Sequence, residues 1–349
     1  MSAFKVLLIG GSNFVISNGI RKHLEDILRK SINQTLEIRN IAVGGTGSLL
    51  GLERLSEESL EDTPFDTILI EYGINDWGTY QTNPLLWQAG FEALFQKLQF
   101  NWPRADIINV ILGRRDQRFW NNQAKMHEIM TSIANEYNAT TINIDKDLKS
   151  LSGKQPFDQF YRDDAHIAEP IITHHVASLI SNHILRKKDN ANFNITKTQK
   201  KQKTLKTHAL ERKDIFQNSQ FTAKCRKLIF GETINLKLAT IPHAVSFVST
   251  KDSGALHIKI KEKAIIINTT QGESNYKLDF VIKHTPINGM FSEKFPDNQK
   301  LIDIEITAID STHSLWDNTI IQKVWATTVP LKTKPEAYII NLSTIECHE

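Results

Sequence analysis

Long hydrophobic runs are missing from this sequence of 349 residues. No apolar stretch reaches the roughly 18 residues that a membrane-spanning helix needs. The first apolar run is also not followed by the small-residue cleavage site that is typical of an export signal. We therefore expect a cytoplasmic protein without a membrane span.

Cysteine is scarce, since Cys225 and Cys347 are the only two in the chain. They lie far apart in the sequence, so they do not form the paired cysteines of a typical zinc motif. This usage fits a reducing compartment and argues against a structural zinc site. We predict no bound metal.

An excess of one charge is also absent, because 42 Lys and Arg residues face 39 Asp and Glu residues for a formal charge of +3. Such a balance argues against nucleic acid as the main partner. The content of 40% hydrophobic and 23% charged residues excludes a disordered chain, and the length allows two domains.

Apolar runs alternate with helical patterns up to about residue 186. This alternation predicts an α/β domain over residues 1–186, in which a five-stranded parallel sheet is flanked by helices in three flavodoxin-like layers. The strands are expected at 6–9, 36–43, 67–71, 107–112 and 141–144, and the clearest helices at 20–28, 85–98, 123–137 and 167–185.

The pattern changes after this domain. Residues 187–215 are rich in Lys, Asn and Thr and are predicted to be a linker. From there to residue 349, short β-branched runs separated by Gly, Pro, Asp and Asn predict a smaller, mainly-β, sandwich-like domain. We expect an accessory role for it, carbohydrate binding being one candidate, because the candidate chemistry lies upstream.

Four short polar segments follow predicted strands or precede the last predicted helix of the first domain. They are "GGSN" at 10–13, "NIAVGGTGS" at 40–48, "EYGINDW" at 71–77 and "YRDDAHIAE" at 161–169. Alone, the first segment is equally consistent with turn and helix-cap chemistry. Together and in this order, the four segments resemble the signature blocks of the SGNH, or GDSL, family of esterases and acyltransferases.

The resemblance implies a role for each matching residue. Ser12 would be the nucleophile, His166 its base and Asp163 the residue that orients the imidazole. The backbone N–H groups of Ser12 and Gly45 and the side chain of Asn75 would form the oxyanion hole.

These residue types suit acyl chemistry. A serine hydroxyl becomes a good nucleophile when a base such as histidine takes its proton, and a carboxylate three residues before His166 can reach the second ring nitrogen. Asp164 is a rival whose spacing of two residues directs it elsewhere. Asn75 offers a neutral donor for a developing oxyanion, and Asp76 is expected to hold its loop.

The sequence departs from the family at Gly11, where the family usually carries Asp. The closing glycine of the G-x-S-x-G elbow is missing, which argues against an ordinary α/β-hydrolase. Gly44, Gly45 and Gly47 do not complete the G-x-G-x-x-G pattern of a dinucleotide site.

Four further residues are candidates for substrate binding. Arg114 and Arg115 follow the fourth predicted strand and could clamp an anionic group, although loop arginines are often only solvated. Trp77 and Tyr80 follow Asn75 and could stack on a sugar ring, although core packing explains them equally well.

The residues and the resemblance leave three functions open. We favour an O-acetyltransferase that moves acetyl from acetyl-CoA to a hydroxyl of a bacterial capsule or other surface polysaccharide. The alternatives are a carbohydrate esterase or deacetylase and a non-catalytic glycan-binding module. The expected partners are a saccharide and an acyl donor, with no permanently bound cofactor; the acyl group, the saccharide and the oligomeric state are not specified by the sequence.

Overall fold

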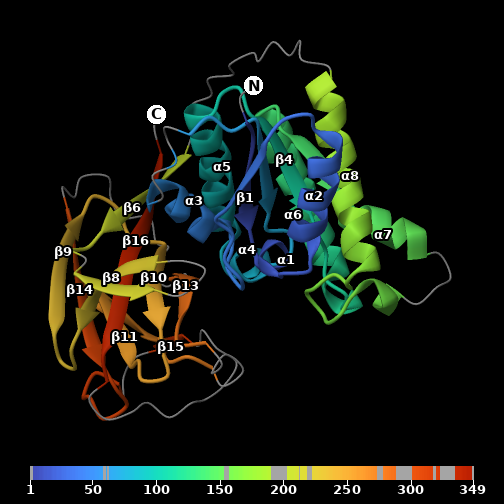
Figure 1. Cartoon of the computed structure of the whole chain (residues 1–349). Coiled ribbons are helices and arrows are strands. Elements are labelled where there is room, and N and C mark those ends of the chain that lie inside the picture. The colour runs from blue at the N-terminus through green and yellow to red at the C-terminus, as the bar shows by residue number, and fades with distance from the viewer. Residues whose placement is uncertain are drawn as a thin grey trace. The chain divides into compact units, whose positions relative to one another are not determined.

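The computed structural model describes residues 3–57, 60, 63–152, 157–189, 203–211, 213–217, 222–272, 278–287, 301–316, 320–322 and 335–347. Contacts divide the chain into two compact units, Met1–Lys201 and Gln202–Glu349. Each unit has its own sheets. In Figure 1 the strands of the first unit are blue to green and those of the second are yellow to red.

The first unit contains a five-stranded parallel sheet in the order β2-β1-β3-β4-β5. The central strands β1 and β3 are buried along nearly their whole length, as expected for a parallel sheet covered on both faces. The strands are β1 (Phe4–Gly10), β2 (Leu36–Asn40), β3 (Thr67–Glu71), β4 (Asp106–Ile111) and β5 (Thr140–Asn143). The predicted fold class of this domain is confirmed.

Helices cover both faces of this sheet. Apolar residues of α2 (Ile20–Ser31), α7 (Ile144–Ser152) and α8 (Ile171–Asp189) share one core with alternate residues of β1, β3 and β4. In Figure 1, α3 (Ser48–Glu57) and α5 (Pro84–Asn101) lie on the other side of β1 from α2 and α8. The remaining helices are α1 (Ser12–Val15), α4 (Trp77–Thr82), α6 (Trp120–Glu136) and the 3₁₀ turns η1 (Gln117–Phe119) and η2 (Phe157–Phe160).

Local polar contacts explain where two elements depart from the expected bounds. β2 ends at Asn40 rather than at residue 43, where the Asn40 side chain accepts the N–H of Ala42 at 3.0 Å. The chain still runs beside β1 to residue 43, because Val43 donates its N–H to the carbonyl oxygen of Gly10 at 3.0 Å. α5 begins at Pro84 because Asn83 caps it by accepting the N–H of Leu86 at 3.0 Å.

The second unit is mainly antiparallel. One sheet has the order β13-β10-β16-β8-β7, with β6 also paired to β16, and the other has the order β15-β12-β11-β14-β9. Apolar residues from both sheets form one buried core, which makes the unit a sandwich and confirms the predicted class. The strands are β6 (Lys203–Ala209), β7 (Asp214–Gln217), β8 (Thr222–Leu228), β9 (Thr233–Leu238), β10 (Ala244–Ser249), β11 (Ala255–Ile260), β12 (Lys263–Asn268), β13 (Val281–Pro286), β14 (Ile302–Ile309), β15 (Ile320–Gln322) and β16 (Ala337–Cys347).

Regular structure enters the range 187–215 from both ends. Helix α8 continues to Asp189, β6 begins at Lys203, and β7 begins at Asp214. Residues 190–202 of the predicted linker lie outside the described residues.

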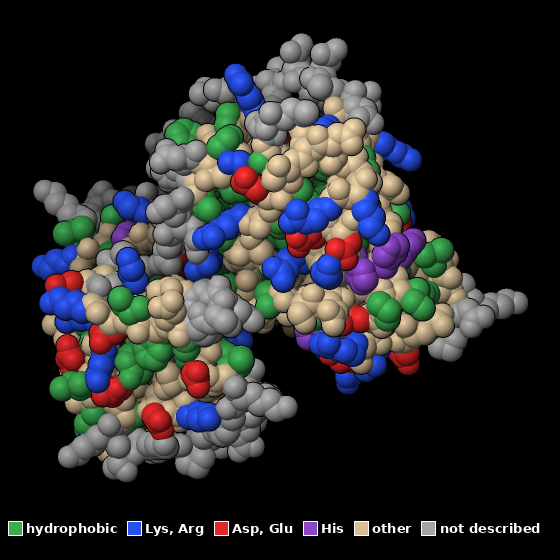
Figure 2. Space-filling model, in the orientation of Figure 1, with side chains coloured by type: hydrophobic (Ala, Val, Ile, Leu, Met, Phe, Trp, Pro, Cys, Tyr) green, Lys and Arg blue, Asp and Glu red, His purple; other side chains and the backbone are tan. Residues whose placement is uncertain are grey.

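The surface carries both signs of charge. On the face drawn in Figure 2, Lys and Arg side chains are interspersed with Asp and Glu. Among the helices that the structure describes, none combines the length and the apolar character needed to cross a membrane.

Candidate active site

Ser12 stands directly beyond the carboxyl end of β1, as the first residue of the short helix α1. The preceding Gly11 donates its N–H to the carbonyl oxygen of Glu71, the last residue of β3, at 3.1 Å. This bond continues the pairing of β1 with β3 up to the residue before the serine. Ser12 is therefore held at the edge of the sheet where parallel strands gather their loops.

His166 lies in the loop before α8, 154 residues after Ser12 in the sequence, and its side chain contacts Ser12. Its Nε2 lies 2.8 Å from Ser12 Oγ, and its Nδ1 lies 2.8 Å from each carboxylate oxygen of Asp163. Because an ionised carboxylate only accepts, Nδ1 carries the proton and Nε2 is left to accept the hydroxyl hydrogen of Ser12. The three side chains form one directed chain of hydrogen bonds.

Asp163 is fixed by its own loop. Its Oδ1 accepts the backbone N–H groups of Ala165 at 2.9 Å and His166 at 3.0 Å. Partial burial raises the pKa of Asp163, but the hydrogen bonds from Ala165 and from the His166 ring outweigh this effect and leave the pKa below its ordinary value. The carboxylate is consequently ionised where a histidine is neutral.

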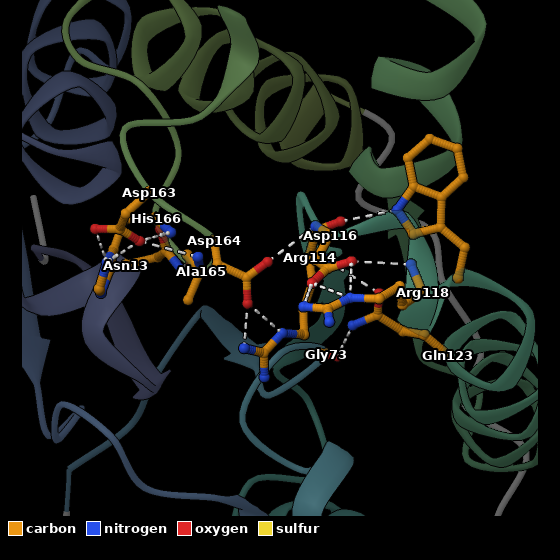
Figure 3. A network of polar contacts seen from close by, with 11 residues as sticks. Asn13, Gly73, Arg114, Asp116, Arg118, Gln123, Asp163, Asp164, Ala165 and His166 are labelled. Atoms are coloured by element: carbon orange, nitrogen blue, oxygen red, sulfur yellow. Dashed lines mark hydrogen bonds and ion pairs between the residues drawn. The ribbon is translucent and has the colours of Figure 1, made fainter. Parts of the chain in front are cut away.

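Asp164 points away from this chain, as its spacing predicts. It accepts a hydrogen bond from Arg114 Nε at 2.8 Å and the backbone N–H of Asp116 at 2.9 Å. Figure 3 shows Asp163 and His166 together on one side and Asp164 turned toward Arg114 on the other. The two neighbouring aspartates thus have separate partners.

Asn75 and the loop after β2 both approach Ser12. A Cβ atom added to Gly11 would lie only 1.9 Å from Asn75 Nδ2, so the amide packs against the backbone of Gly11. A Cβ at Gly44 would lie 3.7 Å from the Ser12 Cβ, which brings the turn before Gly45 against the serine. Gly45 has φ +71°, a left-handed conformation that favours glycine.

Asn75 keeps its amide free of partners among the described residues, and its side chain is partly exposed. The neighbouring Asp76 differs, since it is buried and accepts the N–H of Ser48 at 2.7 Å and the indole N–H of Trp87 at 2.9 Å. Burial raises the pKa of Asp76 to about 6. Asp76 holds its loop, while the Asn75 amide lies beside Gly11, the residue before the serine.

The candidate substrate residues are engaged to different degrees. Arg114 is ion-paired with Asp164 and lies 4.9 Å over the ring of Phe119. Trp77 is buried beside Tyr80 and Phe119. Arg115 and Tyr80 retain partial exposure, and Arg115 Nε lies 3.8 Å from Asp158. Substrate contact by these residues stays a prediction, and the surroundings of Arg115 and Tyr80 leave most room for it.

Two residues of α6 that the sequence did not single out support the loop after β3. Gln123 Nε2 donates to the carbonyl oxygen of Gly73 at 3.2 Å, and His127 Nε2 lies 3.2 Å from the same oxygen. Gln123 also accepts the N–H of Arg114 at 3.0 Å. Both are buried polar residues on a helix with no special spacing, so the sequence carries no signal for them.

A hydrogen-bonded Ser-His-Asp chain at the carboxyl edge of a doubly covered parallel sheet defines a class of serine-dependent acyl-transfer domain. The model of the GDSL-like lipase/acylhydrolase family matches residues 16–170. The first unit of this chain is therefore similar to that family over the matched range. The matched range includes Gly45, Asn75, Asp163 and His166 and begins four residues after Ser12, so the placement of Ser12 rests on its contacts.

Several solved structures are similar to this chain at low sequence identity. A two-domain esterase active on acetylated mannans, co-crystallised with mannopentaose, is 17% identical with a TM-score of 0.67, over 99% of this chain and 92% of that one. An acetylxylan esterase from Geobacillus stearothermophilus is 15% identical with a TM-score of 0.42, over 56% and 97% of the two chains. A lipase/acylhydrolase from Enterococcus faecalis is 16% identical with a TM-score of 0.44, over 56% and 100%. No curated protein sequence matches this chain.

The contact between Gly11 and Asn75 predicts the effect of a single methyl group. In Gly11→Ala, the new Cβ must displace the Asn75 amide, since the two atoms cannot lie 1.9 Å apart. Loss of an oxyanion donor costs about 100- to 1,000-fold in turnover, so we expect kcat for p-nitrophenyl acetate to fall toward that range. Gly78→Ala is the control, because a Cβ there meets nothing within 4 Å. Unchanged turnover in Gly11→Ala would contradict a role of Asn75 in the reaction.

Glu71 predicts a pH-dependent stability. It is fully buried, neither carboxyl oxygen has a hydrogen-bond partner among the described residues, and burial raises its pKa from 4.5 to about 8. Between these two values the folded chain keeps a proton that the unfolded chain loses, so a rise in pH lowers the free energy of unfolding, by up to about 1.4 kcal/mol per pH unit.

Glu71→Gln removes this proton linkage and keeps the shape of the side chain. In urea unfolding at several pH values, we expect the variant to gain stability over the wild type as the pH rises through this window. The difference should level off above pH about 8, where the folded wild type is also ionised. Parallel stability curves for the two proteins would show that Glu71 is ionised in the folded state throughout.

Proposed function

We propose that the first unit is a serine esterase that removes acyl groups, most simply acetyl, from hydroxyls of a saccharide. The observation that carries this proposal is the chain from Ser12 Oγ through His166 to Asp163, with 2.8 Å at each step. The match of residues 16–170 to the model of the GDSL-like lipase/acylhydrolase family supports the same chemistry.

In the first half-reaction, Ser12 Oγ attacks the ester carbonyl carbon while His166 Nε2 takes the hydroxyl proton. The ionised Asp163 stabilises the imidazolium through Nδ1–H. The carbonyl oxygen becomes negative, and donors from Ser12, Gly45 and Asn75 would bind it. When the carbon–oxygen bond to the alcohol breaks, His166 returns the proton to the leaving sugar hydroxyl and an acyl-serine remains.

In the second half-reaction, water replaces the sugar. His166 takes one proton of the water as its oxygen attacks the acyl carbon, and the oxyanion forms again at the same donors. The bond to Ser12 Oγ then breaks, His166 gives the proton back to the serine, and the carboxylic acid leaves. Each group ends in its starting protonation state.

Two observations support a saccharide substrate and hydrolysis. A solved structure that resembles this chain over 99% of its length is a two-domain esterase active on acetylated mannans, and this chain likewise has a second unit after the first. Transfer from acetyl-CoA to a capsule or surface polysaccharide, which the sequence analysis favoured, would also form an acyl-serine, with the coenzyme A thiol as the leaving group in place of the sugar hydroxyl. A sugar hydroxyl would then replace water in the second half-reaction, and this preference stays a prediction for experiment.

Replacement of the nucleophile tests the serine mechanism. We expect Ser12→Ala to lower kcat on p-nitrophenyl acetate and on acetylated mannan by at least about 1,000-fold, because the three residues act as one unit. Ser178→Ala is the control, since the hydroxyl of this partly exposed serine of α8 bonds to His174 of the same helix. Full turnover by Ser12→Ala would refute the serine mechanism.

The acceptor separates hydrolysis from transfer. We expect the protein to release acetate from acetylated mannan in water, without any dependence on coenzyme A. In a parallel reaction with acetyl-CoA and deacetylated mannan, mass spectrometry should detect no acetylated sugar. Glycan-dependent release of free coenzyme A, together with acetylated product, would instead establish a transferase.

A further inference from the structure

Asn13, the residue after the serine, joins the two loops that carry Ser12 and His166. Its Nδ2 donates to the carbonyl oxygen of Ala165 at 3.1 Å, and its Oδ1 accepts the N–H of Ile167 at 3.2 Å. These two backbone groups stand on either side of His166. Asn13 is 4% exposed, and its contact with Ile167 is buried while that with Ala165 is partly buried.

The contacts of Asn13 hold the histidine loop against the serine turn, which the hydrogen bonds within the histidine loop do not do. The bonds from Asp163 to Ala165 and His166 make the histidine loop rigid within itself, but they do not set where that loop sits. Asn13 is adjacent to the nucleophile and grips the histidine loop by its backbone. It thereby ties the histidine loop directly to the serine across 154 residues of sequence, whereas Asp164 ties the same loop to Arg114 and Asp116.

The opposite side of the serine turn is held in a similar way. Asn40, at the end of β2, donates from Nδ2 to the carbonyl oxygen of Phe14 at 2.9 Å while its Oδ1 accepts the N–H of Ala42. Helix α1 is therefore tied to β2 through Phe14 and to the histidine loop through Asn13. The serine turn has little freedom to shift when the histidine loop is clamped to it.

Only a side chain with one donor and one acceptor at this reach satisfies both backbone groups. A carboxylate would present an oxygen to the carbonyl of Ala165, and an alkyl group would leave the buried N–H of Ile167 and the partly buried carbonyl of Ala165 without this partner. An unpaired buried group of this kind favours movement of the loop toward water.

We propose that Asn13 is a positioning residue for the reaction, which acts by holding the His166 loop in register with Ser12. The inference rests on the proposed serine mechanism. A displacement of about 1 Å between reacting groups costs about 100-fold in rate. The loss of Asn13 therefore affects proton transfer more than the binding of substrate.

The test uses the full chain and p-nitrophenyl acetate, whose good leaving group lets slow turnover be followed. We expect Asn13→Ala and Asn13→Asp to lower kcat by about 100-fold, with KM changed less than about threefold. Asn83→Ala is the matched control, because Asn83 also accepts a backbone N–H but caps α5. It should lose thermal stability and keep kcat.

A double-mutant cycle with His166→Ala separates positioning from general structural damage. If Asn13 acts through His166, Asn13→Ala in the His166→Ala background changes turnover by less than about threefold. An equal loss in both backgrounds, or a wild-type kcat in Asn13→Ala, would overturn the inference. Ser12→Ala is assayed beside these variants, because its full activity would refute the serine mechanism itself and not only the role of Asn13.

Discussion

The candidate site depends on one constraint, which is that parallel strands leave their carboxyl ends at the same edge of a sheet. The order β2-β1-β3 places β1 in the middle, so Ser12 emerges between the loop with Gly44 and the loop with Asn75. The pairing of the strands thereby brings these residues together although they are far apart in sequence. The histidine loop, which follows β5 at a distance, is the one part that this constraint does not place.

Gly11 illustrates how two positions of such a site depend on each other. Judged on its segment alone, the glycine lacks the carboxylate that relatives usually carry. In the folded unit, the space beside its Cα is taken by the amide of Asn75, and the carboxyl of Glu71 lies near the same point. Asn75 can occupy its position because Gly11 has no side chain. A larger residue at position 11 therefore requires a different arrangement of residue 75.

Sequence patterns predicted the contacts that are local or that follow from the sheet. The spacing of Asp163 and His166 and the strand ends before Ser12 and Asn75 are of this kind. The pairing of Arg114 with Asp164 and the clamp of Asn13 on the 165–167 backbone join segments with no common period or motif. In the second unit the apolar runs indicated most strands, but the neighbours of each strand depend on long-range pairing.

The place of β16 has a consequence for biosynthesis. This strand pairs with β10, β8 and β6, yet it is the last described strand to leave the ribosome. Until it emerges, β6 has no partner strand among the described pairings, and β10 and β8 lack the strand that joins them. The first unit ends its last helix at Asp189, so it can fold during translation while the sandwich waits for its central strand.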